Sequence, residues 1–182
     1  MQEAISAVNP KALTAAVGQL ELHPTEPQRL TALAKALATL ASNSENRAAI
    51  AKAGGLQAII HALQGDVVDV EFIEAAINLM NQFSKNDVFR EQIAKLGGIK
   101  ALIQIMLKFI DNRAVVEKCL TTLANLGYNS DANVKEIITH GGVEATLKVM
   151  QKWQKETGEL IFSPSIAEYL TNGDLQACCN WR

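Results

Sequence analysis

Three histidines are the side chains of this sequence best suited to metal binding or proton transfer. His23, His61 and His140 stand far apart, and none belongs to a closely spaced pair that could hold a metal ion. His140 precedes a glycine pair, where a cationic side chain suits the C-terminus of a helix. The carboxylates are scattered rather than paired in an apolar setting. These patterns predict no catalytic residue, no metal site and no cofactor, so we expect a protein that is not an enzyme.

The cysteines and the net charge limit the expected cellular location and the expected partners. Cys119 lies inside a helical pattern and Cys178 and Cys179 are adjacent, which is not the pattern of a disulfide framework. No run has the length of a membrane span, and no N-terminal signal is present. A net charge of −2 gives no general reason to expect nucleic acid or an acidic membrane as partner. We predict a cytoplasmic protein, with the nucleus as an alternative, that neither enters a membrane nor binds nucleic acid.

The glycines form the clearest pattern in the chain. Three pairs each separate two short amphipathic segments, and these are Gly54–Gly55, Gly97–Gly98 and Gly141–Gly142. None continues as the Gly-Lys-Ser or Gly-Lys-Thr of a phosphate-binding loop. The pairs are 43 and then 44 residues apart. A regular period of this size is typical of a helical solenoid, in which each repeat buries its apolar face against its neighbours.

A third apolar stripe completes each repeat. Apolar residues three and four positions apart run from Leu30 to Leu40, from Val70 to Phe83 and from Val115 to Leu126. Each repeat therefore contains a short helix before the glycine pair, a second helix after it and a longer third helix. The glycine pair has a mechanical reason, because the chain must turn steeply with positive φ and without a Cβ at the close approach.

The period divides one domain, residues 1–182, into repeat-length parts. We predict a degenerate N-terminal cap, three repeats, and a partial repeat or tail, at residues 1–26, 27–69, 70–112, 113–156 and 157–182. End repeats are expected to be atypical because one face has no neighbour. In the tail, Ser163-Pro164 can begin a helix through Ile166 and Leu170, which would be the third helix of a fourth repeat. The alternative is a frayed cap or a truncated end.

These features resemble the armadillo repeat family. The matching pieces are the Ile-x-x-x-Gly-Gly-hydrophobic corner, the Leu-Ala-Asn125-Leu126 sequence of the third helix, and the period of about 43 residues. The resemblance covers about residues 10–155. It implies an all-α fold, a right-handed solenoid of stacked three-helix repeats whose third helices line a concave groove. Such grooves bind extended peptides or partner proteins, so the resemblance implies a protein or peptide partner.

The resemblance also implies which side chains face that groove. Aligning the third helices gives a first row just before the last apolar residue, which consists of Thr39, Gln82 and Asn125. A second row lies one helical turn earlier and consists of Lys35, Asn78 and Thr121. Lys118 lies near the same face. In the family, an asparagine in the first row can hold a peptide backbone, because its amide both donates and accepts. Only Asn125 matches outright. In the nuclear-import receptors a tryptophan in the second row stacks on basic side chains, and its absence here argues against capture of nuclear localisation signals by that mechanism.

Other functions stay open at this point. The leading prediction is a non-catalytic scaffold that binds an extended partner segment along the third helices. Because three repeats make a short groove, the chain can instead be a structural subunit or fragment of a larger assembly, docking through apolar end-face residues such as Phe162, Tyr169 and Trp181. A regulatory subunit of an enzyme is a third option. The polar residues of the third helices can also be a solvated face without a partner.

Overall fold

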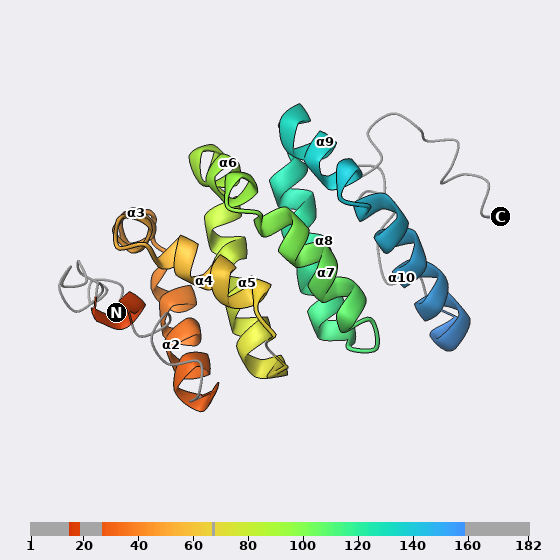
Figure 1. Cartoon of the computed structure of the whole chain (residues 1–182), viewed down its shortest axis with the longest axis horizontal. Coiled ribbons are helices and arrows are strands. Elements are labelled where there is room, and N and C mark those ends of the chain that lie inside the picture. The colour runs from red at the N-terminus through yellow and green to blue at the C-terminus, as the bar shows by residue number, and fades with distance from the viewer. Residues whose placement is uncertain (1–14, 19–26, 67, 159–182) are drawn as a thin grey trace. The chain divides into compact units, whose positions relative to one another are not determined.

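The computed structural model describes residues 15–18, 27–66 and 68–158. Within these residues the chain consists of helices joined by short turns, without a strand (Figure 1). Residues 15–18 form a single helical turn. The longer helices are α2 (Pro27–Leu40), α3 (Ser44–Lys52), α4 (Gly55–Gln64), α5 (Val70–Ser84), α6 (Asp87–Lys95), α7 (Gly98–Lys108), α8 (Arg113–Gly127), α9 (Asp131–Thr139) and α10 (Gly142–Thr157).

These helices follow the predicted order of three per repeat. The short helices α3, α6 and α9 each lead into a glycine pair, and α4, α7 and α10 follow the pair. The three predicted apolar stripes lie within α2, α5 and α8. The boundaries between repeats stay a prediction. Most of the predicted N-terminal cap and of the C-terminal tail lies outside the described residues, as do His23, Phe162, Tyr169, Cys178, Cys179 and Trp181.

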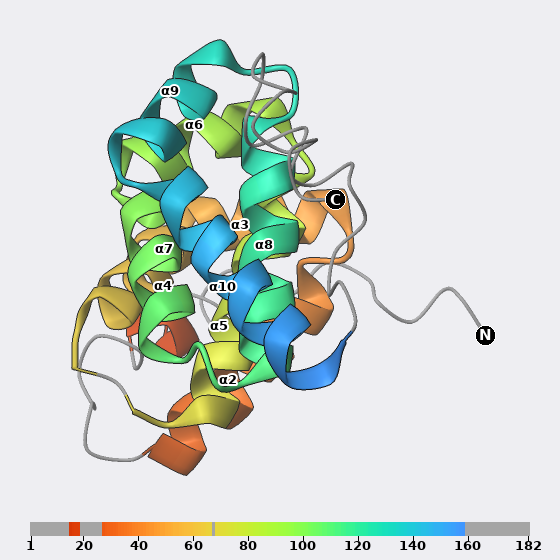
Figure 2. The ribbon, with the colours of Figure 1, turned by 90° about the vertical axis from the view of Figure 1, so that its right-hand side faces the viewer.

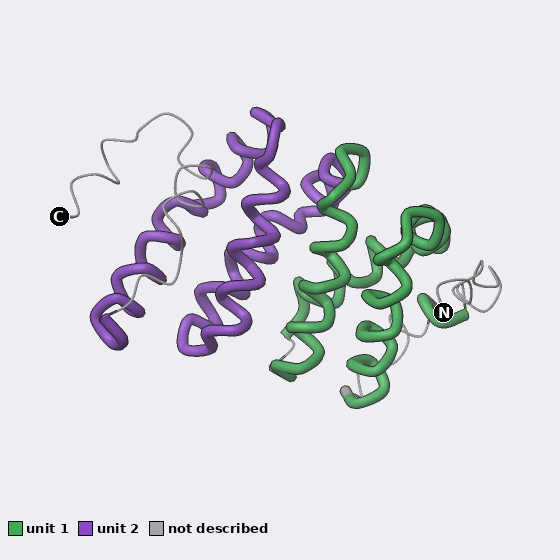
Figure 3. The backbone as a smooth tube through the Cα atoms, turned by 180° about the vertical axis from the view of Figure 1, so that it is seen from behind, with its two compact units in different colours: residues 1–89 green, residues 90–182 purple. Residues whose placement is uncertain are grey.

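The chain forms two compact units, unit 1 (residues 1–89) and unit 2 (residues 90–182), which are described separately (Figure 3). In unit 1, α5 packs along α2 and against α4, and α3 contacts α4. In unit 2, α8 packs against α7 and α9. There α10 contacts α7 and α9, and Figure 2 shows it at the end of the chain that faces the viewer.

The first glycine of each pair supplies an unusual backbone conformation. Gly54, Gly97 and Gly141 have φ values of 84°, 76° and 75°. This left-handed region is strained for residues with a Cβ and costs glycine nothing. Each of these glycines is also the N-cap of the following helix, and no side-chain hydrogen bond caps that helix end. The predicted need for positive φ is confirmed at all three corners.

The second glycine of the pair is needed for space. A Cβ on Gly142 would lie 2.5 Å from Cγ2 of Ile137 and 2.8 Å from the carbonyl oxygen of the same residue. A Cβ on Gly55 would lie 2.6 Å from Cγ2 of Ile50 and 3.0 Å from its carbonyl oxygen. These isoleucines are the first residue of the Ile-x-x-x-Gly-Gly pattern, and both are fully buried. The corner therefore closes one helix against the backbone of the next.

The change of period from 43 to 44 residues has a local cause. Three residues separate Leu40 from α3 and Phe83 from α6, whereas four separate Leu126 from α9. Asn129 lies in this longer connection and has a φ of 51°. Asparagine tolerates the left-handed region better than most residues. The additional residue therefore lies in the turn between α8 and α9 and not inside a helix.

Side-chain caps mark where several helices begin. The side chain of Asp69 accepts a hydrogen bond from the backbone N–H of Phe72 at the start of α5. Asn112 does the same for Val115 at the start of α8. Such caps satisfy N–H groups that the first turn of a helix leaves without a partner. The long third helices of both units therefore start at defined residues, which sets the direction of their side chains.

The core is aliphatic, as the composition predicts. Leu37, Met80 and Leu123 of the third helices are at most 1% exposed. Phe83 and Phe89 make an edge-to-face pair with ring centroids 5.1 Å apart. Cys119 is fully buried, and this burial raises the pKa of its thiol far above the usual range. It is the small core residue that its helical pattern predicts.

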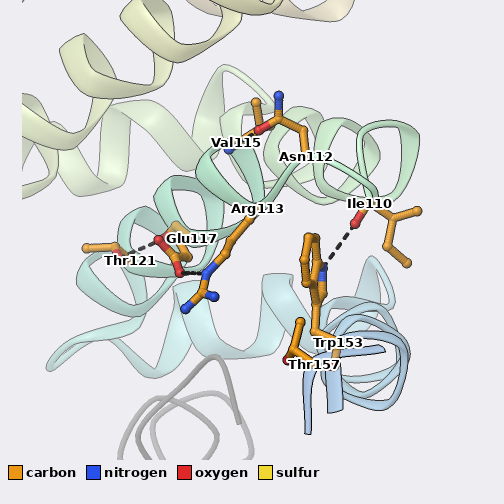
Figure 4. A network of polar contacts seen from close by, with 8 residues as sticks. All are labelled: Ile110, Asn112, Arg113, Val115, Glu117, Thr121, Trp153 and Thr157. Atoms are coloured by element: carbon orange, nitrogen blue, oxygen red, sulfur yellow. Dashed lines mark hydrogen bonds and ion pairs between the residues drawn. The ribbon is translucent and has the colours of Figure 1, made fainter. Parts of the chain in front are cut away.

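Helix α10 is longer than the other second helices, with 16 residues against 10 in α4 and 11 in α7. Its last turns hold the connection between α7 and α8. The indole Nε1 of Trp153 donates to the carbonyl oxygen of Ile110 at 3.1 Å (Figure 4). Lys152 forms ion pairs with Asp111 and Glu156. The hydrogen bonds to these two carboxylates raise the pKa of Lys152.

The second glycine of a corner is open to a direct test. We expect Gly142→Ala to lower the free energy of unfolding by about 1–3 kcal/mol, because the new methyl group meets a backbone oxygen that cannot move away. Gly65→Ala is the matched control, since its Cβ would meet only the oxygen of Ala62 at 3.4 Å and its φ is −79°. Urea denaturation followed by circular dichroism measures both. Equal midpoints for the two variants would contradict the steric role of Gly142.

Candidate functional site

The predicted groove residues of unit 1 lie on two neighbouring helices, α2 and α5. Lys35 and Thr39 are exposed on α2, and Asn78 is exposed and Gln82 half-buried on α5. The hydroxyl of Thr39 donates to the carbonyl oxygen of Lys35 at 3.0 Å, so its proton is used within the helix. The side-chain oxygen of Gln82 accepts from Lys85 at 2.8 Å. Because α5 packs along α2, these four residues lie on adjacent helices.

Asn78 differs from its neighbours along the chain in its exposure. Ile77 and Leu79 on either side are fully buried, whereas the Asn78 side chain is exposed. Within the described residues its amide makes no hydrogen bond to the protein. One carbonyl acceptor and two N–H donors therefore face solvent in the middle of a helix.

An ion pair that the sequence analysis did not predict links the same two helices. Nζ of Lys35 lies 3.0 Å from a carboxylate oxygen of Glu71, and the two side chains are 59% and 75% exposed. An exposed pair of this kind contributes at most about 1 kcal/mol and is easily opened. The pair borders an open depression of about 570 Å³ whose lining is mostly polar: Gln28, Thr31, Ala32, Lys35, Asp69, Val70 and Glu71.

The sequence did contain a signal for Glu71. It lies seven residues before Asn78, which is close to two helical turns, so both side chains belong to one face of α5. The residue equivalent to Glu71 in the preceding repeat, 43 positions earlier, is Gln28 on α2. Gln28 also lines the depression. Extending the repeat alignment two turns toward the N-terminus of the third helices would have found both residues.

In unit 2 the predicted residues lie on α8. Thr121 is exposed, and Lys118 and Asn125 are half-buried, so none of the three belongs to the buried stripe of this helix. The hydroxyl of Thr121 donates to the carbonyl oxygen of Glu117 at 2.8 Å. Glu117 also pairs with Arg113, with a distance of 2.7 Å from Nε to the carboxylate (Figure 4). The surface of α8 therefore carries both signs of charge, from Arg113, Glu117 and Lys118.

Asn133 shows a different use of asparagine in unit 2. Its side chain is 3% exposed, and Nδ2 donates to the carbonyl oxygen of Leu126 at 2.8 Å near the end of α8. In unit 1, Arg47 serves the corresponding end of α2, donating to the carbonyl oxygens of Ala41 and Ser42. The Asn133 contact satisfies a carbonyl group in the last turn of α8, and the Arg47 contacts satisfy carbonyl groups of the turn that follows α2. These contacts are structural, and sequence analysis did not distinguish them from the groove positions.

The two described histidines belong to different units. His61 is exposed on α4, while His140 ends α9 with Nε2 3.1 Å from a carboxylate oxygen of Glu136. In residues 15–18, 27–66 and 68–158 no group of three or more His, Cys, Asp or Glu side chains is arranged to hold a metal ion. None of the helices in this part of the chain is long and apolar enough to cross a membrane.

Comparison with known proteins identifies the fold. No protein-family model matches the chain, and no curated protein matches its sequence. Among solved structures, an engineered protein of the Northeast Structural Genomics Consortium matches with a TM-score of 0.70 and 24% identity, covering 89% of this chain and 62% of that one. A designed armadillo repeat protein in complex with the peptide (KR)4 matches with a TM-score of 0.69 and 19% identity, covering 89% and 64%.

A third structure, of computationally designed armadillo repeat proteins for modular peptide recognition, has a TM-score of 0.70 and 17% identity, and the match covers 93% of this chain and 74% of that one. The chain thus spans less than two thirds of two of these three proteins. At these identities the likeness shows the fold. This chain has the armadillo-type repeat fold, an all-α solenoid, which confirms the predicted fold class and the resemblance.

The structure distinguishes the buried, hydrogen-bonded Asn133 from the exposed Asn78. We expect Asn133→Ala to lower the free energy of unfolding by about 1–3 kcal/mol, because it leaves a buried carbonyl without a partner. Asn78→Ala should change the same quantity by less than about 0.5 kcal/mol, because Asn78 is exposed and its side chain has no hydrogen bond to the part of the chain that the structure describes. Chemical denaturation of both variants measures the difference. A loss at Asn78 as large as that at Asn133 would contradict this assignment.

Proposed function

We propose that this chain is a non-catalytic protein-interaction scaffold that binds an extended segment of a partner along the polar faces of its third helices. The main observation in support of the proposal is that the Asn78 amide is exposed on α5, whereas Ile77 and Leu79 on either side of it are fully buried. Asparagine is a weak helix former, and a position in mid-helix without a hydrogen bond to the described residues gives it no structural purpose among them. Binding gives it one.

The chemistry of this face suits a peptide backbone. An extended segment presents N–H and C=O groups that no secondary structure satisfies, and a side-chain amide can donate to one while accepting from the other. Asn78 and Gln82 on α5, and Asn125 on α8, supply amides on third helices of both units. Individual contacts of this type are weak, so affinity would come from several repeats acting on one segment.

The ion pair of unit 1 adds a means of side-chain selection. Lys35 and Glu71 are both more than half exposed, so a charged side chain of the partner can replace either of them at little cost. The depression beside them is large enough for a side chain to enter. Glu71 and Asp69 make its rim more acidic than basic. We therefore favour a basic or amide side chain of the partner at this place.

Two of the comparisons support the proposal by analogy. One designed armadillo repeat protein is in complex with a peptide, and another structure is described as designed for modular peptide recognition. The second candidate function is that of a structural subunit docking through an end face of the chain. What favours it is that the apolar residues Val143, Leu147 and Met150 of α10 are only half-buried.

The proposal is tested by replacing the amides together. Affinity purification followed by mass spectrometry compares wild type with Asn78→Ala/Gln82→Ala/Asn125→Ala. We expect proteins enriched by the wild-type chain to be reduced at least about tenfold, the effect of losing roughly 1.4 kcal/mol of binding free energy.

A control variant removes as many polar groups elsewhere. Gln57→Ala/Gln104→Ala/Lys148→Ala changes exposed residues of the second helices α4, α7 and α10. It should retain the partners, and its melting temperature and that of the amide variant should stay near that of wild type. Retention of the same partners by the amide variant, or their loss from the control, would exclude binding along the third helices.

A further inference from the structure

An exposed aromatic side chain follows the last turn of α8. Tyr128 is the C-cap of this helix, and its backbone N–H donates to the carbonyl oxygen of Ala124 at 3.1 Å. Tyr128 is 45% exposed. A single exposed apolar residue is common on protein surfaces, so exposure alone assigns no role to this ring.

The ring of Tyr128 is held in place by a buried cation. Cζ of Arg90 lies 5.8 Å from the ring centroid. Arg90 belongs to α6 and is only 8% exposed, so a largely buried guanidinium contacts a ring that is itself partly exposed. A cation–π contact that is shielded from water is stronger than an exposed one. The contact therefore fixes the ring on one face while part of the ring stays accessible.

The repeat does not require an aromatic residue at this position. Two residues after the last apolar residue of the third helix, the first two repeats have Ser42 and Lys85 where the third has Tyr128. Ser42 and Lys85 are both exposed polar residues. Because the turn after the third helix forms with serine or lysine, the ring of Tyr128 is not needed to build the turn.

Tyr128 also continues the row of predicted groove residues on α8. Thr121, Asn125 and Tyr128 follow one another at spacings of four and three residues, which places them on one side of the helix. One helical turn rises about 5.4 Å. A partner segment whose backbone meets the amide of Asn125 therefore brings a side chain within reach of Tyr128.

We infer that Tyr128 binds an uncharged aromatic side chain of the partner, which stacks on the accessible part of its ring. Binding at Tyr128 rests on the proposed function and adds to it the chemistry of one partner residue. Tyrosine is among the residues that most often dominate the binding energy of protein interfaces. A ring that is already fixed by Arg90 also loses little conformational entropy when a partner binds.

The contact with Arg90 decides which side chain is favoured. A cationic side chain on the other face of the ring would be repelled by the guanidinium, and this repulsion is strong because Arg90 is largely buried. An anionic side chain would meet the negative face of the ring. An aromatic side chain can pack in an offset or edge-to-face arrangement without either penalty. The favoured residue thus differs from the basic or amide residue proposed for Lys35 and Glu71 of unit 1.

Selection from a phage-displayed library of random linear peptides on the full chain tests this inference. We expect peptides selected by wild type to share a Phe, Tyr or Trp at one recurrent position. Their binding should fall at least about tenfold in Tyr128→Ser and less than about twofold in Tyr128→Phe, which keeps the ring. Ile138→Ser is the matched control, because Ile138 is 49% exposed in the same unit but lies on the first helix α9. It should bind like wild type.

The outcomes separate this inference from the proposed function. Peptides that lose affinity in Asn78→Ala/Gln82→Ala/Asn125→Ala but bind Tyr128→Ser as tightly as wild type would overturn the role of Tyr128 and leave the proposed function intact. A recurrent Arg or Lys that depends on Tyr128 would overturn the preference for an aromatic residue. Peptides that depend on neither variant, or no selected peptide at all, would overturn both.

A measurement on the wild-type complex needs no variant and holds even if Tyr128→Ser folds poorly. We expect nuclear Overhauser contacts between the ring protons of Tyr128 and those of the recurrent aromatic residue of a selected peptide. Absence of these contacts in a complex saturated with peptide would overturn the inference.

Discussion

Two helices meet at the Gly54–Gly55 and Gly141–Gly142 pairs with no room for a side chain on the second glycine, and the other features of this structure depend on that contact. The first glycine turns the chain with positive φ, and the second lets one helix close on the isoleucine of the preceding one. Because the corner repeats, α5 and α8 pack on the second helices α4 and α7 of their own units and are left with one polar face. The arrangement that buries Ile77 and Leu79 is thus the one that exposes Asn78.

Backbone geometry was the part of the fold most open to prediction from sequence. Glycine pairs at a nearly constant period allow few structures, and the apolar stripes at three- and four-residue spacing could be assigned to helices directly. The additional residue near Asn129 was visible only as a change of period, because its placement in a turn depends on local dihedral angles. The predicted groove positions followed from aligning the third helices, and three of them, Lys35, Asn78 and Thr121, are exposed in the structure.

The contacts between side chains were harder to predict, for a physical reason. Asn78 and Asn133 are the same residue on amphipathic helices, yet one faces solvent and the other satisfies a buried carbonyl across seven residues of chain. Residue type alone does not separate them. Glu71 was missed because its partner Lys35 lies 36 residues away on another helix. The length of α10 was likewise not foreseen, since its last turns are held by Trp153 and Lys152 against the connection between α7 and α8.

The central claim is that the corners leave the third helices free to bind a partner, and photo-crosslinking from single positions tests it most directly. A photoreactive amino acid is placed in turn at Lys35, Asn78 and Thr121 on third helices, and at Gln57, Gln104 and Lys148 on second helices, all exposed in the structure. Binding along the third helices predicts crosslinks to a partner from the first group and none from the second. Crosslinks from the second group alone would contradict it.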